Sequence, residues 1–399
     1  MAQDPTSQQD EFAAEVLDAV LATGLVRSAR YDPEAFAIVY EREGAGTIYL
    51  HNTYRETLEA SPDERTERIA RLLTILQSSA GEMSWAQARP NLRPVLRGVS
   101  FGLSVPGATT VDNPKRLLCR PALPYLNELV VIDEPTSMAY VTHIRLREWG
   151  VGPDEVFAAA RENLAATTGG LGGPPPESGR AMVRFVDDGN GYFTSMLLLD
   201  GFLAGLAERV GGRPVAFIAD KDSLLVTAEE PAAMPQLYAM VEEQFREAVR
   251  SISPVAYTVD DAGQVVPYQG PQGTDAARAA HRAEVILASS EYQGQKEALD
   301  SQFEQDNVDI FCASVLVAER PDKSLFSVAV WGFDVDSLLP EADYVAFQGD
   351  GDPVTVPFPV VVAEAGLSPE PFYTPTRYRV TSWPDADVMA RIRQHAVSP

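Results

Sequence analysis

The chain has 399 residues, of which 45% are apolar and 22% charged, enough for two or three globular domains with hydrophobic cores. Asp and Glu outnumber Lys and Arg by 57 to 32, which gives a formal net charge of −25 at pH 7. This composition excludes a wholly disordered chain. The negative charge repels phosphate groups, and no basic stripe offsets it, so nucleic acid is not an expected partner.

The N-terminal residues and the two cysteines of the chain indicate its cellular compartment. Residues 1–11 (MAQDPTSQQDE) lack the basic and apolar regions of a secretory signal. No run approaches the roughly 18 apolar residues of a membrane-spanning helix. Cys119 and Cys312 are far apart and form neither a CxxC pair nor a disulfide framework. We therefore predict a cytoplasmic protein with reduced thiols and no membrane partner.

The first segment, residues 1–90, is predicted to fold as a helix, a hairpin and a helix. Gly24 is expected to end the first helix, and Ser61, Pro62 and Glu64 form a capping-box pattern that begins the second. The predicted elements are a helix at 12–21, strands at 36–40 and 47–50, and a helix from 61 to about 79.

The second segment, residues 91–268, is predicted to be β-rich and then to repeat the order helix, hairpin, helix. A Gly- and Pro-rich tract at 167–179 is predicted to be an exposed loop. The predicted strands are 94–103, 117–120, 129–132, 138–146, 182–186, 215–219 and 223–227, and the predicted helices are 152–165, 193–210 and 237–249.

The third segment, residues 275–399, follows a turn-rich stretch at 257–275 that predicts a boundary. It is predicted to be an acidic, β-rich module preceded by a long helix. Its predicted elements are a helix at 276–303, a hairpin of 309–318 with 324–331, a hairpin of 344–348 with 354–362, and a helix from 384. Pro357 and Pro359 are expected to confine the last strand to a sheet edge.

Together these elements predict an α+β fold: two helix-hairpin-helix layers around a mixed or antiparallel sheet, with a C-terminal β-rich module. Four stretches also carry a family resemblance, namely 93–97 (RPVLR), 149–164, 188–206 and 215–228. In order and spacing they resemble the YtpQ-like family of uncharacterised bacterial proteins, domain of unknown function 1444, over about residues 12–268. That family has no known activity, cofactor or catalytic residue, so the resemblance implies no site. The C-terminal module lies beyond the stretch that resembles this family.

One short motif matches a catalytic pattern. Residues 98–102 (GVSFG) fit the GxSxG nucleophile elbow, with Ser100 as the nucleophile. An elbow requires a helix directly after the serine, and residues 103–107 (LSVPG) cannot begin one. The motif is therefore predicted to be an ordinary turn at the end of a strand, unless the fold brings Ser100 to a pocket beside His143 or His51.

Metal ligands are sought among the histidines and the acidic clusters. The four histidines show no HxH or HxxxH spacing, and His281 with Glu284 forms an HxxE pair of a kind common on helix surfaces. A Ca²⁺ or Mg²⁺ ion would prefer the carboxylates of the C-terminal module. The metal candidates are Asp334, Asp336, Asp350 and Asp352. Solvated turns are the favoured explanation of these residues, so no cofactor is predicted and a divalent cation stays the less favoured alternative.

No short stretch gathers a nucleophile, a base and a ligand set, which favours a non-enzymatic binding or regulatory protein. Its acidic surface suggests a basic protein partner. Two alternatives remain open: a hydrolase with a dispersed or metal-assisted site, and a small-ligand sensor with a pocket between the core and the C-terminal module.

Overall fold

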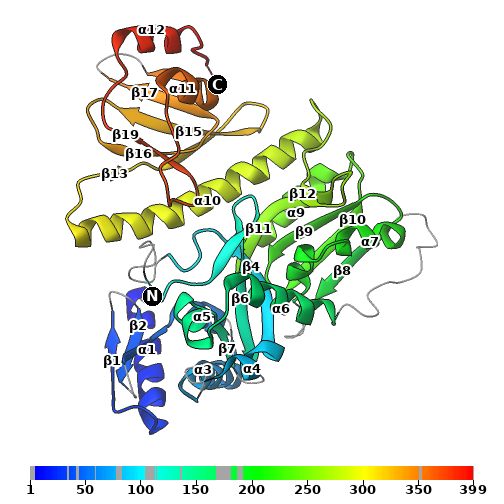
Figure 1. Ribbon diagram of the computed structural model, residues 1–399, viewed down its shortest axis with the longest axis vertical. Coiled ribbons are helices and arrows are strands. Elements are labelled where there is room, and N and C mark those ends of the chain that lie inside the picture. The colour runs from blue at the N-terminus through cyan, green and yellow to red at the C-terminus, as the bar shows by residue number, and fades with distance from the viewer. Residues whose placement is uncertain are drawn as a thin grey trace. The chain divides into compact units, whose positions relative to one another are not determined.

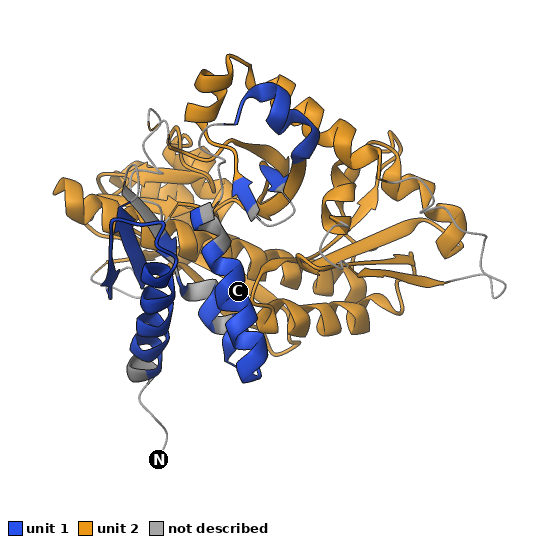
Figure 2. Ribbon diagram, turned by 90° about the horizontal axis from the view of Figure 1, so that it is seen from below, with its two compact units in different colours: residues 1–92, 131–139 blue, residues 93–130, 140–399 orange. Residues whose placement is uncertain are grey.

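The computed structural model describes residues 5–33, 36–41, 45–58, 60–77, 83–103, 113, 115–134, 137–167, 181–186, 192–349 and 353–398. The fold is α+β, as predicted. The chain divides into two compact units, which Figure 2 shows in different colours. Unit 1 comprises residues 1–92 and 131–139, and unit 2 comprises residues 93–130 and 140–399.

Unit 1 is built on an antiparallel sheet of order β1-β2-β3, packed against helices α1 and α3. Its apolar cluster includes Phe12, Val16, Ile38 and Ile48. The predicted capping box is confirmed, because the backbone N–H of Ser61 donates to the Glu64 carboxylate over 2.8 Å. The elements are α1 (Pro5–Ala22), β1 (Ser28–Asp32), β2 (Ala37–Glu41), β3 (Ala45–Tyr49), α2 (His51–Thr57), α3 (Pro62–Gln77), α4 (Trp85–Ala88) and the 3₁₀ helix η1 (Arg89–Asn91).

A four-stranded sheet follows in the order β4-β6-β5, with β7 also paired to β6. Its strands are β4 (Leu92–Gly98), β5 (Cys119–Leu123), β6 (Leu126–Glu134) and β7 (Ser137–Tyr140). The strand predicted over 138–146 is wrong in its second half, which forms α5 (His143–Trp149). Only Leu146 of that helix is buried, and Gly150 ends it in the left-handed conformation at φ 68°. The next helix, α6 (Pro153–Ala165), agrees with the prediction.

The largest sheet of unit 2 is antiparallel, with the order β12-β11-β9-β10-β8 (Figure 1). The predicted hairpin around Asp220–Asp222 is confirmed as β9 paired with β10. The strands are β8 (Met182–Val186), β9 (Pro214–Asp220), β10 (Ser223–Ala228), β11 (Ser251–Val259) and β12 (Val265–Pro267). Helix α9 (Met234–Glu247) packs on β9 and β11.

The single helix predicted over 193–210 is wrong. The segment forms η2 (Phe193–Leu198), α7 (Phe202–Gly205) and α8 (Ala207–Val210). Gly201 interrupts it with φ 74°, a conformation that a continuous right-handed helix cannot contain. The apolar run therefore predicted correctly that the segment is largely buried, but wrongly that it forms one continuous helix. Of the predicted loops, 168–179 and 187–191 lie outside the described residues.

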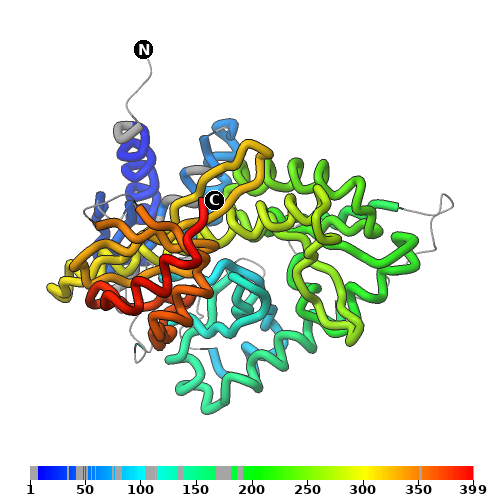
Figure 3. The backbone as a smooth tube through the Cα atoms, turned by 90° about the horizontal axis from the view of Figure 1, so that it is seen from above, coloured from blue at the N-terminus to red at the C-terminus, as the bar shows by residue number. Residues whose placement is uncertain are grey.

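Helix α10 (Asp275–Asp306) contacts both β11 and α9 of the five-stranded sheet and β13, β14 and β15 of the C-terminal module. The module is orange to red and the sheet green in Figure 3. The module has two small sheets, β13-β16-β19 and β14-β15-β17-β18. Its elements are β13 (Phe311–Cys312), β14 (Val315–Glu319), β15 (Leu325–Gly332), β16 (Ser337–Pro340), β17 (Tyr344–Gln348), β18 (Val354–Pro357), α11 (Phe358–Ala365), β19 (Arg377–Val380) and α12 (Ala386–Arg393).

Both predicted hairpins of the module are confirmed, as β14 with β15 and β17 with β18. The strand predicted to reach residue 362 stops at Pro357, because residues 358–365 form α11 with Pro359 in its first turn. β18 lies at a sheet edge, as its proline predicts. No helix among the described residues is both long and apolar enough to cross a membrane.

A buried arginine joins α10 to the module. Arg377 is 0% exposed, and its guanidinium donates to Gln295 Oε1 over 2.6 Å and to the carbonyls of Ala313 and Leu338 over 2.8 and 2.9 Å. The guanidinium also lies 5.3 Å from the centroid of the Tyr292 ring. Gln295 and Tyr292 belong to α10, so one side chain satisfies acceptors from the helix, from the residue that follows β13 and from β16.

We expect Arg377→Met to destabilise unit 2 by at least about 3 kcal/mol, because it leaves several buried acceptors without a donor. Urea unfolding followed by circular dichroism measures this loss. The matched control is Arg379→Met, two residues along the same strand, where an exposed arginine pairs with Asp336. Its expected cost is below about 1 kcal/mol. Equal losses in the two variants would contradict the role given to Arg377.

Candidate functional site

The GxSxG turn is docked on α10. The backbone N–H of Ser100 donates to Oε2 of Glu291 over 2.8 Å, and the Ser100 hydroxyl also hydrogen-bonds this carboxylate. Glu291 is only 7% exposed. A Cβ on Gly98 would overlap the Glu291 carboxylate, and a Cβ on Gly294 would lie 2.7 Å from Ser100 Oγ. Both glycines are therefore required for the close approach of turn and helix.

This geometry explains the motif without a nucleophile. The Ser100 oxygen faces a buried carboxylate and the backbone of α10, and residues 101–103 directly after it form a turn rather than a helix. The predicted strand-end turn is thus confirmed. Ser100 is not among the residues that line the pocket containing His143.

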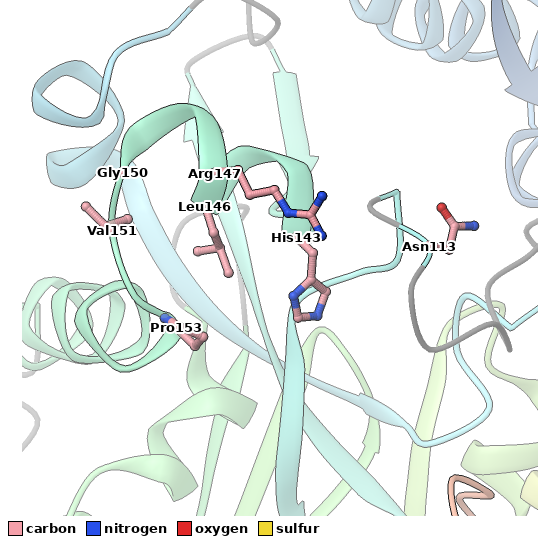
Figure 4. Close-up of a pocket in the computed structure, with 7 residues that line it drawn as sticks. All are labelled: Asn113, His143, Leu146, Arg147, Gly150, Val151 and Pro153. Carbon is pink, nitrogen blue, oxygen red and sulfur yellow. The ribbon is translucent and has the colours of Figure 1, made fainter.

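That pocket has a volume of about 420 Å³ and lies in unit 2 (Figure 4). One side is apolar and the other carries the Arg147 guanidinium, the His143 imidazole and an asparagine amide. None of the seven described lining residues is acidic. They are Asn113, His143, Leu146, Arg147, Gly150, Val151 and Pro153.

Local structure sets the positions of the two basic residues. Thr142, at the N-cap of α5, forms an isolated bridge with Leu117, and the backbone N–H of His143 donates to the carbonyl of Arg116 over 3.1 Å. His143 and Arg147 are four residues apart on the helix, so they project from one face. The sequence contained this spacing, but the strand predicted over 138–146 concealed it.

The described residues that line the pocket include a guanidinium and no carboxylate, although the chain is acidic. Burial, reinforced by the charges of Arg116 and Arg147, lowers the pKa of His143 and favours its neutral imidazole. Arg147 makes no hydrogen bond or ion pair with any described residue, whereas Arg145 on the same helix pairs with Glu148 over 2.7 Å. Nε of Arg116 is likewise buried without a partner in the described part of the chain. These groups can donate to an anion.

A second polar cluster lies between α10 and the C-terminal module. Nε2 of His281 is 3.5 Å from Oδ1 of Asp343, and Oδ2 of Asp343 accepts from the backbone and hydroxyl of Ser327 over 2.7 and 2.9 Å. Burial raises the pKa of Asp343, but these hydrogen bonds outweigh it and lower the pKa overall. The hydrogen bond that the His281 imidazole donates to Asp343 is the main cause that raises the pKa of His281. The carboxylate lies between serine and histidine, so the Ser327 hydroxyl donates to Asp343 and not to the His281 imidazole, unlike the serine of a catalytic triad.

The metal candidates are not brought together in the described structure. Asp336 binds Arg379 through both of its oxygens, over 3.0 and 2.8 Å, which lowers the pKa of Asp336. Asp334 is exposed at φ 54°, and Asp350 and Asp352 lie outside the described residues. Across the described ranges, no group of three or more His, Cys, Asp or Glu side chains is arranged to hold a metal ion.

His51 begins α2 of unit 1, and His395 follows α12 near the C-terminus. Glu284, the partner proposed for His281 in the HxxE pattern, instead accepts from Gln269 over 2.8 Å.

Comparison of the chain with protein-family models, curated proteins and solved structures gave no match. The YtpQ-like resemblance therefore stays a prediction, and the functional argument depends on the geometry of unit 2.

The buried Glu291 predicts a pH dependence of stability. Burial raises its pKa above the ordinary value of 4.5 despite the hydrogen bonds from Ser100, so the folded chain holds this proton more tightly than the unfolded chain. The contribution of Glu291 to stability therefore falls as pH rises from 4.5 through the raised pKa. We expect Glu291→Gln to gain stability relative to the wild type between about pH 4 and pH 8.

Urea unfolding of both proteins across this range measures the difference. Glu297→Gln is the matched control, because it removes an exposed carboxylate from the same helix. A Glu291→Gln difference that is constant with pH, or that moves in the opposite direction, would refute the account of a buried carboxylate.

Proposed function

We propose that this protein is a non-enzymatic binding protein that captures a small anionic ligand in the pocket of Figure 4. The observation that carries the proposal is the Arg147 guanidinium, which faces the pocket beside His143 and binds no described residue. A protein of net charge −25 that places an unpaired cation in a concave site without acidic lining has the chemistry to select anions.

The shape of the pocket limits the ligand class. A volume of about 420 Å³ is within the range of small-molecule sites. Leu146, Val151 and Pro153 offer an apolar wall, while Arg147 offers the planar donor fork that matches a carboxylate or a phosphate. A ligand with one anionic head and a small apolar body would satisfy both walls.

Binding is favoured over catalysis because the described lining residues include an imidazole but no hydroxyl, thiol or carboxylate within the pocket. The one serine in a catalytic motif, Ser100, is engaged by Glu291. The alternative of a hydrolase with a dispersed or metal-assisted site predicts turnover, which the binding proposal does not.

We expect Arg147→Gln to weaken anion binding about ten- to a hundredfold, because it removes a charge-assisted donor pair. Isothermal titration calorimetry with inorganic phosphate, acetate and benzoate as separate probes measures the affinity. His143→Gln is also expected to weaken the binding of these probes, since the imidazole ring flanks the guanidinium.

Arg145→Gln is the control, because it removes an equal charge from the same helix where that charge is already paired with Glu148. If no probe binds the wild type, or if Arg145→Gln reduces affinity as much as Arg147→Gln, the pocket is not the anion site. Turnover of ester, phosphate or amide substrates that depends on His143 would support the hydrolase instead.

We further propose that the protein acts in the cytoplasm and has a basic protein partner. The small number of cysteines supports a reducing compartment, and the net charge of −25 supports a cationic partner. Affinity purification from the native cell should recover partners of basic isoelectric point that are lost when salt is raised from about 0.1 M to 0.5 M, because salt screens surface charges. Retention at high salt, or recovery of acidic proteins only, would contradict this proposal.

A further inference from the structure

The segment that leads into β5 connects two residues of the pocket. The backbone N–H of Arg116 donates to the carbonyl of Asn113 over 3.1 Å, and the carbonyl of Arg116 accepts from the backbone N–H of His143 over 3.1 Å. Asn113 and His143 both line the pocket. The bridge between Leu117 and Thr142 continues the connection. Arg116 is therefore held beside the pocket by backbone contacts, although it is not one of the lining residues.

The Arg116 side chain brings a second positive charge to this place. Its Nε is buried and has no hydrogen-bond partner in the described part of the chain. Its charge and that of Arg147 both lower the pKa of His143, so both guanidiniums act on the imidazole. Because the neutral imidazole is favoured, the positive charge at the site comes from the two arginines. None of the described lining residues carries a negative charge that would offset it.

We propose that the ligand of this pocket carries a doubly charged head group, namely the phosphate of a monoester with a small apolar alcohol or phenol. This inference rests on the proposed anion binding and adds the charge and the chemical class of the ligand. A dianion matches two guanidiniums, whereas a carboxylate or a sulfate ester leaves one of the two charges uncompensated. A phosphate monoester has a second pKa of about 6, so it is chiefly dianionic at about pH 7.5.

The two arginines have different roles in this proposal. Arg147 lines the pocket and offers its donor fork to any anionic head group. Arg116 lies behind the lining and acts through its charge, which attracts a dianion more strongly than a monoanion. Arg147 is therefore expected to set whether an anion binds, and Arg116 is expected to set the preference for the dianion.

Isothermal titration calorimetry of the full chain at about pH 7.5 tests the charge of the ligand. Phenyl phosphate and phenyl sulfate have the same apolar body and a tetrahedral head group, but they differ by one negative charge. We expect phenyl phosphate to bind at least about tenfold more tightly than phenyl sulfate. Equal affinities would overturn the dianion proposal and leave anion binding intact. If phenyl phosphate, phenyl sulfate and benzoate all fail to bind, the proposed function fails and this inference fails with it.

Inorganic phosphate tests whether the ligand is an ester. It has the head group without the apolar body, so it makes no contact with the apolar wall formed by Leu146, Val151 and Pro153. We expect it to bind at least about tenfold more weakly than phenyl phosphate, because burial of the phenyl ring contributes to affinity. Binding of inorganic phosphate as tight as that of phenyl phosphate would overturn the assignment to a monoester.

Variants of Arg116 test the source of the preference. Arg116→Gln should reduce the preference for phenyl phosphate over phenyl sulfate to below about threefold, because it removes the second charge. Arg116→Lys keeps the charge and should keep the preference. Arg145→Gln is the control and should leave the preference unchanged, because the Arg145 charge is paired with Glu148. Circular dichroism checks the fold of each variant. An unchanged preference in Arg116→Gln, or its equal loss in Arg116→Lys, would overturn the role given to Arg116.

Discussion

The arrangement of unit 2 depends on a buried guanidinium that has no carboxylate partner among the described residues. Arg377 directs its donors to backbone carbonyls and to Gln295, so its desolvation is offset by hydrogen bonds rather than by an opposite charge. Tyr292 extends the connection, donating its hydroxyl to the carbonyl of Thr376 over 2.6 Å and accepting from the backbone of Glu341 over 3.0 Å. These contacts fix α10 against the module, because their loss leaves buried polar groups on both sides.

The same helix also holds the GxSxG turn, because Glu291, the residue before Tyr292, hydrogen-bonds Ser100. Ser100, which a sequence motif marks as reactive, is here engaged by a structural hydrogen bond with Glu291, and Asp343 is engaged in the same way by Ser327 and His281. The Arg147 guanidinium, in contrast, lines a pocket and has no partner among the described residues. The proposed function follows from this difference between satisfied and unsatisfied polar groups.

Local patterns predicted much of the fold, and long-range contacts explain where they failed. The capping box at Ser61 and the hairpins of β9–β10 and β14–β15 depend on residues close in sequence, and all are confirmed. The apolar run at 193–210 gave no sign that Gly201 would break it. Glu291 lies 191 residues from Ser100, so no local pattern could reveal that the two side chains meet. The pocket was missed because residues four apart lie on adjacent turns of a helix, as His143 and Arg147 do, but about 13 Å apart along a strand.

The anion pocket and the acidic surface act over different distances, which makes them compatible. At physiological salt, charges separated by more than about 8 Å are largely screened from one another. Under the proposed function, the affinity of the pocket would depend mainly on groups within that distance, among them Arg147, His143 and Arg116. The net charge of −25 would act on the approach of a ligand from solution and slow the association of anions. Selectivity would then come from the planar donor fork of Arg147 and not from the overall field, so an anion that cannot match this fork would gain little at the site.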